Sequence, residues 1–184
     1  MVAAIPSSAT SAEQEDSLPT FAAAIEAHKA MVYSILWHFL RDRSLAEELA
    51  QDVFLELHRS WNSLKSAKHL VFWLRRVTAN RAIDFVRKRK LRLETSLEES
   101  AEPTVLERIH DSFLASYLER MVASLPEKQR MIIVLRYQEE MELEEIAQIL
   151  RMNISTVKTQ ASRALELLRA KTEHRLKPGN ENGK

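Results

Sequence analysis

The chain has 184 residues, a formal net charge of +1 and no cysteine, so disulfide frameworks, thiolate metal sites and thiol catalysis are excluded together. Apolar residues make up 45% and charged residues 29% of the chain, with only two glycines and five prolines. This composition favours an all-α fold over a turn-rich β fold. No apolar stretch approaches the roughly 18 residues that span a bilayer, so we expect a cytoplasmic protein with no membrane association.

Helical periodicity begins after a polar leader, residues 1–19, which we expect to be disordered. A first amphipathic helix is predicted by the spacing of Phe21, Ile25, Val32, Ile35, Leu36 and Phe39. A second helix follows over about residues 44–64, and Ser44 with Glu47 is typical of a capping box at its start. A third is predicted over residues 69–90, where Phe72 and Trp73 stand at core spacing. Three helices with short connections predict a bundle over residues 20–90.

Charge is distributed unevenly along the chain. Residues 75–92 carry eight basic side chains against one acid, Asp84, and the next stretch reverses the sign from Glu94 to Asp111. Pro103 and several Ser and Thr residues also lie there, which is typical of an exposed linker. We therefore predict two small domains joined by a flexible acidic linker over residues 91–111.

The second domain is predicted over residues 112–172, followed by a flexible tail, 173–184. Ser124 with Glu127 is typical of a second capping box, beginning a helix that ends near Tyr137. The stretch "ELEEIAQILRMNISTVKTQASRALELLR" then predicts a helix, a short turn and another helix, with Asn153 as the N-cap of the latter. One face of that helix is apolar and the other is polar and flanked by Lys158 and Arg163. This arrangement is that of a helix-turn-helix whose second helix enters the major groove of DNA.

Several segments together resemble a known family. "LPEKQRMIIVLRY", "LEEIAQIL" and "STVKTQASRALELL" are similar to region four of the extracytoplasmic-function group of bacterial sigma factors. "AEELAQDVFLELHRSW" and "FWLRRVTANRAIDFVRKRK" are similar to region two. The two parts follow the family's order and cover roughly residues 20–170. The resemblance implies a region-two-like helical bundle and a region-four-like helix-turn-helix domain.

The resemblance implies a protein without enzymatic activity, catalytic residues, metal or cofactor. Such proteins bind core RNA polymerase, direct it to a two-part promoter and assist DNA melting, commonly under control of an anti-sigma factor. The implied core-polymerase-binding residues are Glu48, Gln51, Asp52 and Glu56. From the residues alone, a merely solvated helix face is the favoured explanation of these four, and the resemblance reverses that preference.

Two DNA-binding surfaces are implied as well. The proximal promoter element would be contacted by Asn80, Arg81, Asp84, Arg87 and Lys88, and the loop of residues 62–69 would capture an unstacked base. The distant element would be read by Ser155, Thr156, Lys158, Thr159, Ser162 and Arg163. The chemistry of the side chains supports part of this assignment, because Lys and Arg neutralise phosphates and Asn can hydrogen-bond to a base edge. The linker can reach about 70 Å, close to two turns of DNA at about 34–36 Å each.

Three other hypotheses remain open. The chain could be a conventional helix-turn-helix regulator that is not a polymerase subunit, a nucleic-acid enzyme, or a family member that no longer reads promoters. The carboxylates form no convergent cluster and the histidines lack metal-ligand spacing, which disfavours an enzyme. Two departures from the family pattern support the third hypothesis. Arg151 stands where the turn often has Gly, requiring either a positive φ or another turn, and Gln160 stands where the family often has a DNA-contacting Arg.

Overall fold

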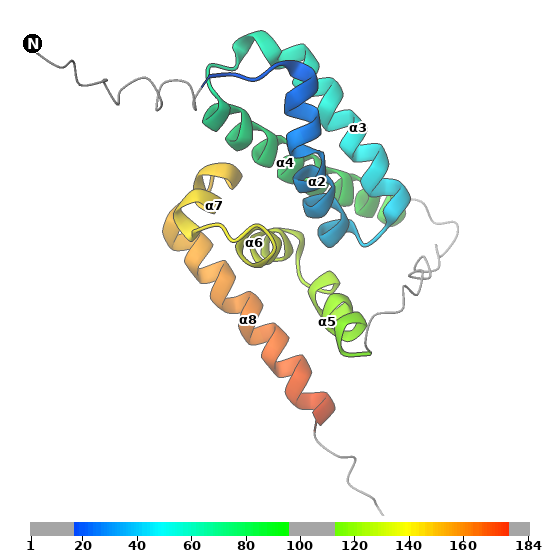
Figure 1. Ribbon diagram of the computed structural model, residues 1–184. Coiled ribbons are helices and arrows are strands. Elements are labelled where there is room, and N and C mark those ends of the chain that lie inside the picture. The colour runs from blue at the N-terminus through cyan, green and yellow to red at the C-terminus, as the bar shows by residue number, and fades with distance from the viewer. Residues whose placement is uncertain (1–16, 96–112, 177–184) are drawn as a thin grey trace, which may run out of the picture.

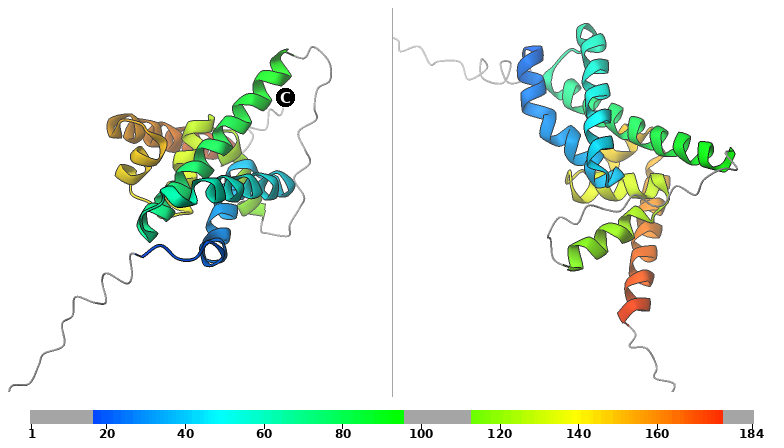
Figure 2. Two further views of the ribbon diagram at one scale, coloured as in Figure 1. Left: turned by 90° about the horizontal axis from the view of Figure 1, so that it is seen from above. Right: turned by 90° about the vertical axis from the view of Figure 1, so that its right-hand side faces the viewer.

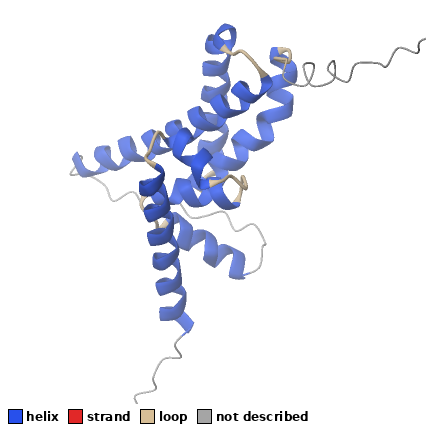
Figure 3. Ribbon diagram, turned by 90° about the vertical axis from the view of Figure 1, so that its left-hand side faces the viewer, coloured by secondary structure: helices blue, strands red, loops and turns tan. Residues whose placement is uncertain are grey.

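The computed structural model describes residues 17–95 and 113–176, and every regular element in these ranges is helical (Figure 3). The first half of the chain contains α2 (Phe21–Leu40), α3 (Arg43–Ser60), a 3-10 turn η1 (Trp61–Ser63) and α4 (Ala67–Thr95). The second half contains α5 (Phe113–Ala123), α6 (Glu127–Tyr137), α7 (Leu143–Leu150) and α8 (Ile154–Leu176). Figure 1 shows this arrangement. The predicted all-α fold is confirmed within these residues.

The helix starts in the first half depend on local caps. Thr20 accepts a hydrogen bond from the backbone of Ala23, and this fixes the start of α2. The predicted Ser44 capping box is wrong, because α3 begins one residue earlier and is capped by Asp42, whose Oδ1 accepts from Leu45 N at 3.0 Å. Asp42, two residues upstream of Ser44, thus provides the cap, and Ser44 lies within the first turn of α3.

Helix α4 is the longest helix of the first half, and its C-terminal end (green) projects beyond the bundle in Figure 2. Residues 91–95, predicted to belong to the linker, are helical instead, because α4 continues to Thr95. The rest of the predicted linker, most of the leader (residues 1–16) and residues 177–184 of the tail lie outside the described residues. Residues 173–176 of the predicted tail are helical, since α8 continues to Leu176.

The second half differs from prediction at the start of α6. The predicted Ser124 capping box is wrong, because α6 begins after Pro126 without a side-chain cap. The Ser124 hydroxyl instead donates to the Met121 carbonyl at 2.7 Å, near the end of α5. Pro126 has no N–H to satisfy and a φ of −52°, which suits the entry into a helix.

The two halves share one apolar core, although the sequence predicted two small domains joined by a linker. Helix α6 lies end-on at the centre of Figure 1, and it contacts α2 and α4 on one side and α8 on the other. Buried residues from both halves form a single cluster, which includes Ile35, Phe39 and Leu74 together with Met131 and Ile132. No helix in the described ranges is long and apolar enough to cross a membrane.

Candidate functional site

Helices α7 and α8 form the predicted helix-turn-helix. Glu142 and Glu145 form a capping box at the start of α7, where the Glu142 N–H donates to Glu145 Oε2 at 3.0 Å. At the start of α8, Asn153 Oδ1 accepts from Ser155 N at 2.9 Å, so the predicted Asn153 cap is confirmed. Val157 and Ala164 are fully buried, which seats α8 against the rest of the second half.

The turn between these helices depends on an arginine in the left-handed conformation. Arg151 has φ 52° and ψ 47°, so the positive-φ alternative left open by the sequence is the correct one. The Met152 N–H donates to the Ala147 carbonyl at 2.9 Å and the Arg151 N–H to the Gln148 carbonyl at 3.3 Å. These two bonds satisfy the last carbonyls of α7 in the pattern of a Schellman motif. The absence of Gly therefore does not prevent the turn.

The outer face of α8 is exposed along its first three turns. The residues predicted to read the distant promoter element are all exposed: Ser155, Thr156, Lys158, Thr159, Ser162 and Arg163. Lys158 Nζ lies 3.1 Å from Glu144 Oε1 of α7, and this hydrogen bond and charge hold the pKa of Glu144 below its usual range. Thr159 Oγ1 donates to the Ser155 carbonyl at 2.9 Å. One predicted DNA-contacting cation is thus partly neutralised by the neighbouring helix.

Gln160 does not share this outer face. Its Oε1 accepts a hydrogen bond from Gln129 Nε2 of α6 at 2.9 Å, and Gln129 is only 8% exposed. The side chain is therefore directed into the packing between α6 and α8. This hydrogen bond links the recognition helix α8 to α6.

The second predicted DNA surface lies on the projecting part of α4. Asn80, Arg81, Asp84, Arg87 and Lys88 are all exposed, whereas Ala79, Ala82 and Ile83 between them are buried. Asp84 Oδ1 lies 3.8 Å from Arg87 Nη1, at the limit of an ion pair. The helix therefore presents a mainly basic edge to solvent while its other face packs on the core.

The predicted polymerase-binding face lies on α3, next to this basic edge. Glu48, Gln51 and Asp52 are exposed, and Glu56 is half-buried. Arg81 Nε donates to Glu56 Oε2 at 2.9 Å, and this bond, followed by charge attraction from Glu56 and Asp52, raises the pKa of Arg81. A predicted polymerase contact and a predicted DNA contact are thus joined directly. Sequence reasoning missed this pair because 25 residues separate its members.

The loop predicted to capture a base, residues 62–69, is shorter than expected. Part of it forms η1, and α4 begins at Ala67, capped by Ser66, whose Oγ accepts from His69 N at 3.2 Å. Asn62, Lys65 and His69 are exposed. Phe72 and Trp73 pack against the core, so the prediction that they are structural is confirmed.

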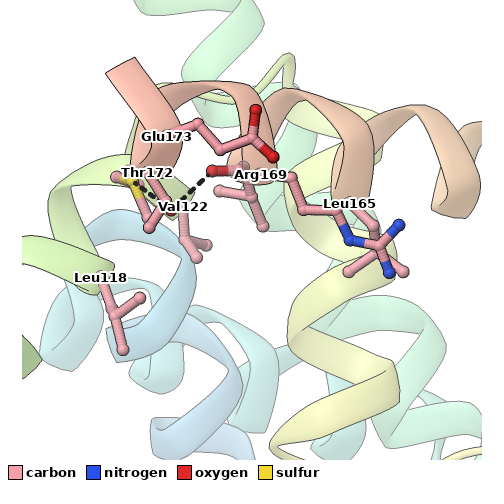
Figure 4. A pocket seen from close by; sticks show the side chains of 8 residues that line it. Leu118, Val122, Leu165, Arg169, Thr172 and Glu173 are labelled. Atoms are coloured by element: carbon pink, nitrogen blue, oxygen red, sulfur yellow. Dashed lines mark hydrogen bonds between the residues drawn. The ribbon is translucent and has the colours of Figure 1, made fainter. Parts of the chain in front are cut away.

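A shallow apolar groove lies between α5 and α8 (Figure 4) and was not predicted from the sequence. Leu118, on its rim, is 47% exposed. The Thr172 hydroxyl at one end donates to the Leu168 carbonyl at 2.9 Å. The lining residues are Leu118, Met121, Val122, Leu165, Leu168, Arg169, Thr172 and Glu173. The apolar rim suits contact with another protein rather than a small polar substrate.

Within the described residues, no group of three or more His, Asp or Glu side chains is placed to hold a metal ion. The notable features are an exposed polar recognition helix, a basic helix edge and an acidic helix face. Together with the all-helical fold, they are typical of a protein that binds DNA through a helix-turn-helix.

Comparison with known proteins specifies this class. The model "Sigma-70 region 2" matches residues 24–92, and the model "Sigma-70, region 4" matches residues 115–168. The chain is 29% identical over 162 residues to the ECF RNA polymerase sigma factor SigW of Bacillus subtilis, covering 81% of this chain and 87% of that protein. It is 32% identical over 130 residues to the RNA polymerase sigma-E factor of Streptomyces avermitilis, covering 71% and 72% respectively.

Solved structures show the same fold. The sigma factor RpoE, from its complex with the anti-sigma factor NepR from Bartonella quintana, superposes with a TM-score of 0.71 at 20% identity, covering 85% of this chain and 98% of that chain. CnrH, in complex with the cytosolic domain of CnrY, gives a TM-score of 0.62 at 19% identity, covering 84% and 88%. The chain belongs to the extracytoplasmic-function (ECF) group of bacterial RNA polymerase sigma factors. It is a non-enzymatic polymerase subunit for transcription initiation.

Proposed function

We propose that the three surfaces divide the work of initiation. The face of α3 with Glu48, Gln51, Asp52 and Glu56 docks on core polymerase, the basic edge of α4 contacts the proximal promoter element, and α8 reads the distant one. The segment between the two units can reach about 70 Å, close to two turns of DNA, so simultaneous contact with two separated elements is feasible. Residues 20–90 thus form the polymerase-binding and proximal-element unit, and residues 112–172 form the distant-element unit.

The observation that carries this proposal is the exposure of the predicted side chains on faces whose opposite sides are buried. On α3, Leu49 and Val53 are in the core while Glu48 and Asp52 are in solvent. On α8, Val157 is buried while Lys158 and Thr159 are exposed. Family membership disfavours the alternative of a regulator that acts without being a polymerase subunit.

The test is a charge reversal on α3. Asp52→Arg is expected to weaken binding to core polymerase by about tenfold or more, because a rim carboxylate would be replaced by a cation against a complementary surface. The matched control is Glu26→Arg, which reverses an exposed carboxylate on α2. Binding of purified full-length chain to core polymerase measures the effect. If both variants bind core polymerase with the same affinity as the parent, the assignment of the interface to α3 is wrong.

We also infer that the protein works in the bacterial cytoplasm under control of an anti-sigma factor. The support is the Bartonella quintana sigma factor, which was solved in complex with the anti-sigma factor NepR. Affinity capture of the tagged chain from its own host at low salt is expected to retain a partner that competes with core polymerase. A captured set that contains only polymerase subunits would contradict this inference.

A further inference from the structure

Arg151, in the turn between α7 and α8, combines an exposed side chain with a backbone conformation that favours glycine. Its φ is 52°, in the left-handed region. The backbone N–H donates to the Gln148 carbonyl and so takes part in the turn. Within the described ranges, no acceptor forms a hydrogen bond or an ion pair with the guanidinium. The contacts of the turn therefore do not account for an arginine at this position.

A second arginine in the same conformation has a clear structural role. Arg41, at the end of α2, has a φ of 57°, and its side chain is only 7% exposed and forms an ion pair with Glu119. Its guanidinium also lies 5.1 Å from the centre of the Trp37 ring. Glu140 has a positive φ as well, so the backbone conformation alone does not identify a site. What distinguishes Arg151 is its position beside the recognition helix.

Arg151 lies next to the end of α8 that would enter the major groove. Asn153 caps this end and is two residues further along, so the two Cα atoms are at most about 7 Å apart. The major groove is about 12 Å wide, and the phosphates of the two strands line its edges. When the first turn of α8 is in the groove, the long side chain of Arg151 is therefore within reach of a phosphate.

The charges along α7 favour contact with DNA at this same end. The N-cap and first turn of α7 are acidic, with Glu142, Glu144 and Glu145 exposed. These carboxylates repel phosphates, and Glu144 also pairs with Lys158 and partly neutralises it. Arg151 follows the opposite end of α7, about 12 Å away for a helix of eight residues. The turn is thus better suited to a phosphate than the start of α7.

We propose that Arg151 binds a phosphate of the DNA backbone beside the recognition helix, and that this contact is the reason for an arginine in a left-handed turn. The proposal rests on the proposed reading of DNA by α8. The ligand is the phosphodiester group, so the contact adds affinity and fixes the position of α8 in the groove but reads no base.

A purely structural role for Arg151 leads to a different expectation. A cation after the end of α7 also offsets the partial negative charge of the helix dipole. If that were its whole contribution, removal of the charge would lower stability and leave the salt dependence of DNA binding unchanged. A phosphate contact instead changes the salt dependence, because each neutralised phosphate releases counterions.

The first experiment measures binding of the full chain to duplex DNA between about 50 and 200 mM salt by fluorescence anisotropy. One duplex carries a promoter selected with the parent holoenzyme, and the other has a scrambled sequence. Arg151→Gln is expected to lower the slope of log affinity against log salt by about 0.9 on both duplexes. Arg151→Lys keeps the charge and is expected to retain the slope.

The matched control is Arg120→Gln, which removes the same charge from an exposed position on α5, away from α7 in Figure 1. This variant is expected to keep the parent slope. An unchanged slope for Arg151→Gln, or an equal loss for Arg120→Gln, would overturn the proposal. A loss confined to the promoter duplex would also overturn it, because a phosphate contact carries no sequence information.

The second experiment separates DNA binding from folding. Arg151→Gly removes the cation and also relieves the left-handed backbone, because glycine has no Cβ. This variant is expected to unfold at no lower urea concentration than the parent and yet to bind both duplexes about fivefold more weakly at about 100 mM salt. A glycine variant that binds DNA as tightly as the parent would refute the phosphate contact.

The outcomes separate this proposal from the proposed function. If the parent holoenzyme selects no promoter, the two-element function fails, and the slope on the scrambled duplex still decides whether Arg151 binds phosphate. If Lys158→Gln lowers the slope and Arg151→Gln does not, α8 still contacts DNA and only the contact from Arg151 is wrong.

Discussion

At the scale of single residues, Arg151 is the position where the chain departs most clearly from ideal backbone chemistry. Its φ of 52° places an L-residue in the left-handed region, where Cβ crowds the following carbonyl. The two hydrogen bonds of the Schellman motif compensate for this cost and keep α7 and α8 in register. The recognition helix is therefore positioned by a strained residue with an exposed side chain.

Replacing this residue tests the strain. Arg151→Gly is expected to stabilise the protein by about 0.5–1 kcal/mol, because glycine adopts positive φ without the Cβ penalty but loses more chain entropy on folding. Denaturant unfolding of the full chain measures the free energy. Arg151→Ala is the control, since it removes the side chain but keeps Cβ, and it should not give the same gain. A destabilised glycine variant would show that the arginine side chain contributes more than the backbone costs.

Local signals predicted some residues correctly and others not. The Asn153 cap could be predicted because its partner is two residues away. The predicted Ser44 cap was wrong, because Asp42, two residues upstream, caps the helix first and places Ser44 inside it. The side of α8 occupied by Gln160 depends on where α6 lies, which is long-range information. Motif spacing alone therefore could not predict the contact between Gln160 and Gln129.

At the scale of elements, both predicted DNA-binding helices carry cations already paired with a neighbouring helix. Lys158 of α8 pairs with Glu144 of α7, and Arg81 of α4 pairs with Glu56 of α3. The faces themselves could be predicted from the 3.6-residue period, because each has a buried opposite side. The two ion pairs could not be predicted from the sequence, since they depend on how two helices cross. Each pair lowers the positive potential offered to phosphates.

The Lys158 pair leads to a measurable salt dependence. Lys158→Gln is expected to lower the slope of log affinity against log salt by about 0.9, the contribution of one phosphate contact. Glu144→Gln is expected to raise affinity at low salt, because Lys158 would lose its competing carboxylate. Binding of the full chain to duplex DNA between about 50 and 200 mM salt measures both. Lys29→Gln on α2 is the control, and an unchanged slope for Lys158→Gln would remove this residue from the interface.

At the scale of the whole molecule, the junction between the halves determines behaviour that neither half has alone. The amino-acid pattern predicted six of the described helices in the right order, because amphipathic periods and charge blocks are local, but it did not predict α5. It did not predict the shared core, because "MIIVL" is equally compatible with a helix buried within one domain or between two. Which face of α6 meets α2 depends on contacts between residues about 90 positions apart, such as Arg130 and Phe39.

The junction also predicts a pH dependence. Burial, followed by the charge of Arg41, lowers the pKa of His38 below the ordinary histidine value of about 6.5. The folded chain therefore binds this proton less readily than the unfolded chain, and the contribution to stability is lost as pH falls from above 6.5 towards the lowered pKa. Burial and then Arg75 act in the same direction on the pKa of His28.

Urea unfolding at about pH 7.5 and about pH 5.5 tests this sign. The midpoint is expected to fall on acidification, and His38→Gln should reduce the fall, because glutamine does not take up a proton. Glu139 acts oppositely, since burial raises its pKa and protonation relieves the cost of a buried charge. Glu139 is present in both proteins, so its contribution to the pH dependence cancels when His38→Gln is compared with the parent. An equal fall in both proteins would assign the pH dependence to other groups.

The consecutive buried residues of α6 have a consequence for the lifetime of the protein in the cell. Any separation of the two halves would bring Met131, Ile132 and their neighbours into solvent, and proteolysis of an opened chain follows the population of the open form. Chains that remain closed, or that lie on polymerase with α6 covered, would be protected, whereas open unbound chains would be degraded first. The amount of this sigma factor would then follow the supply of polymerase, so that surplus copies are removed without a dedicated signal.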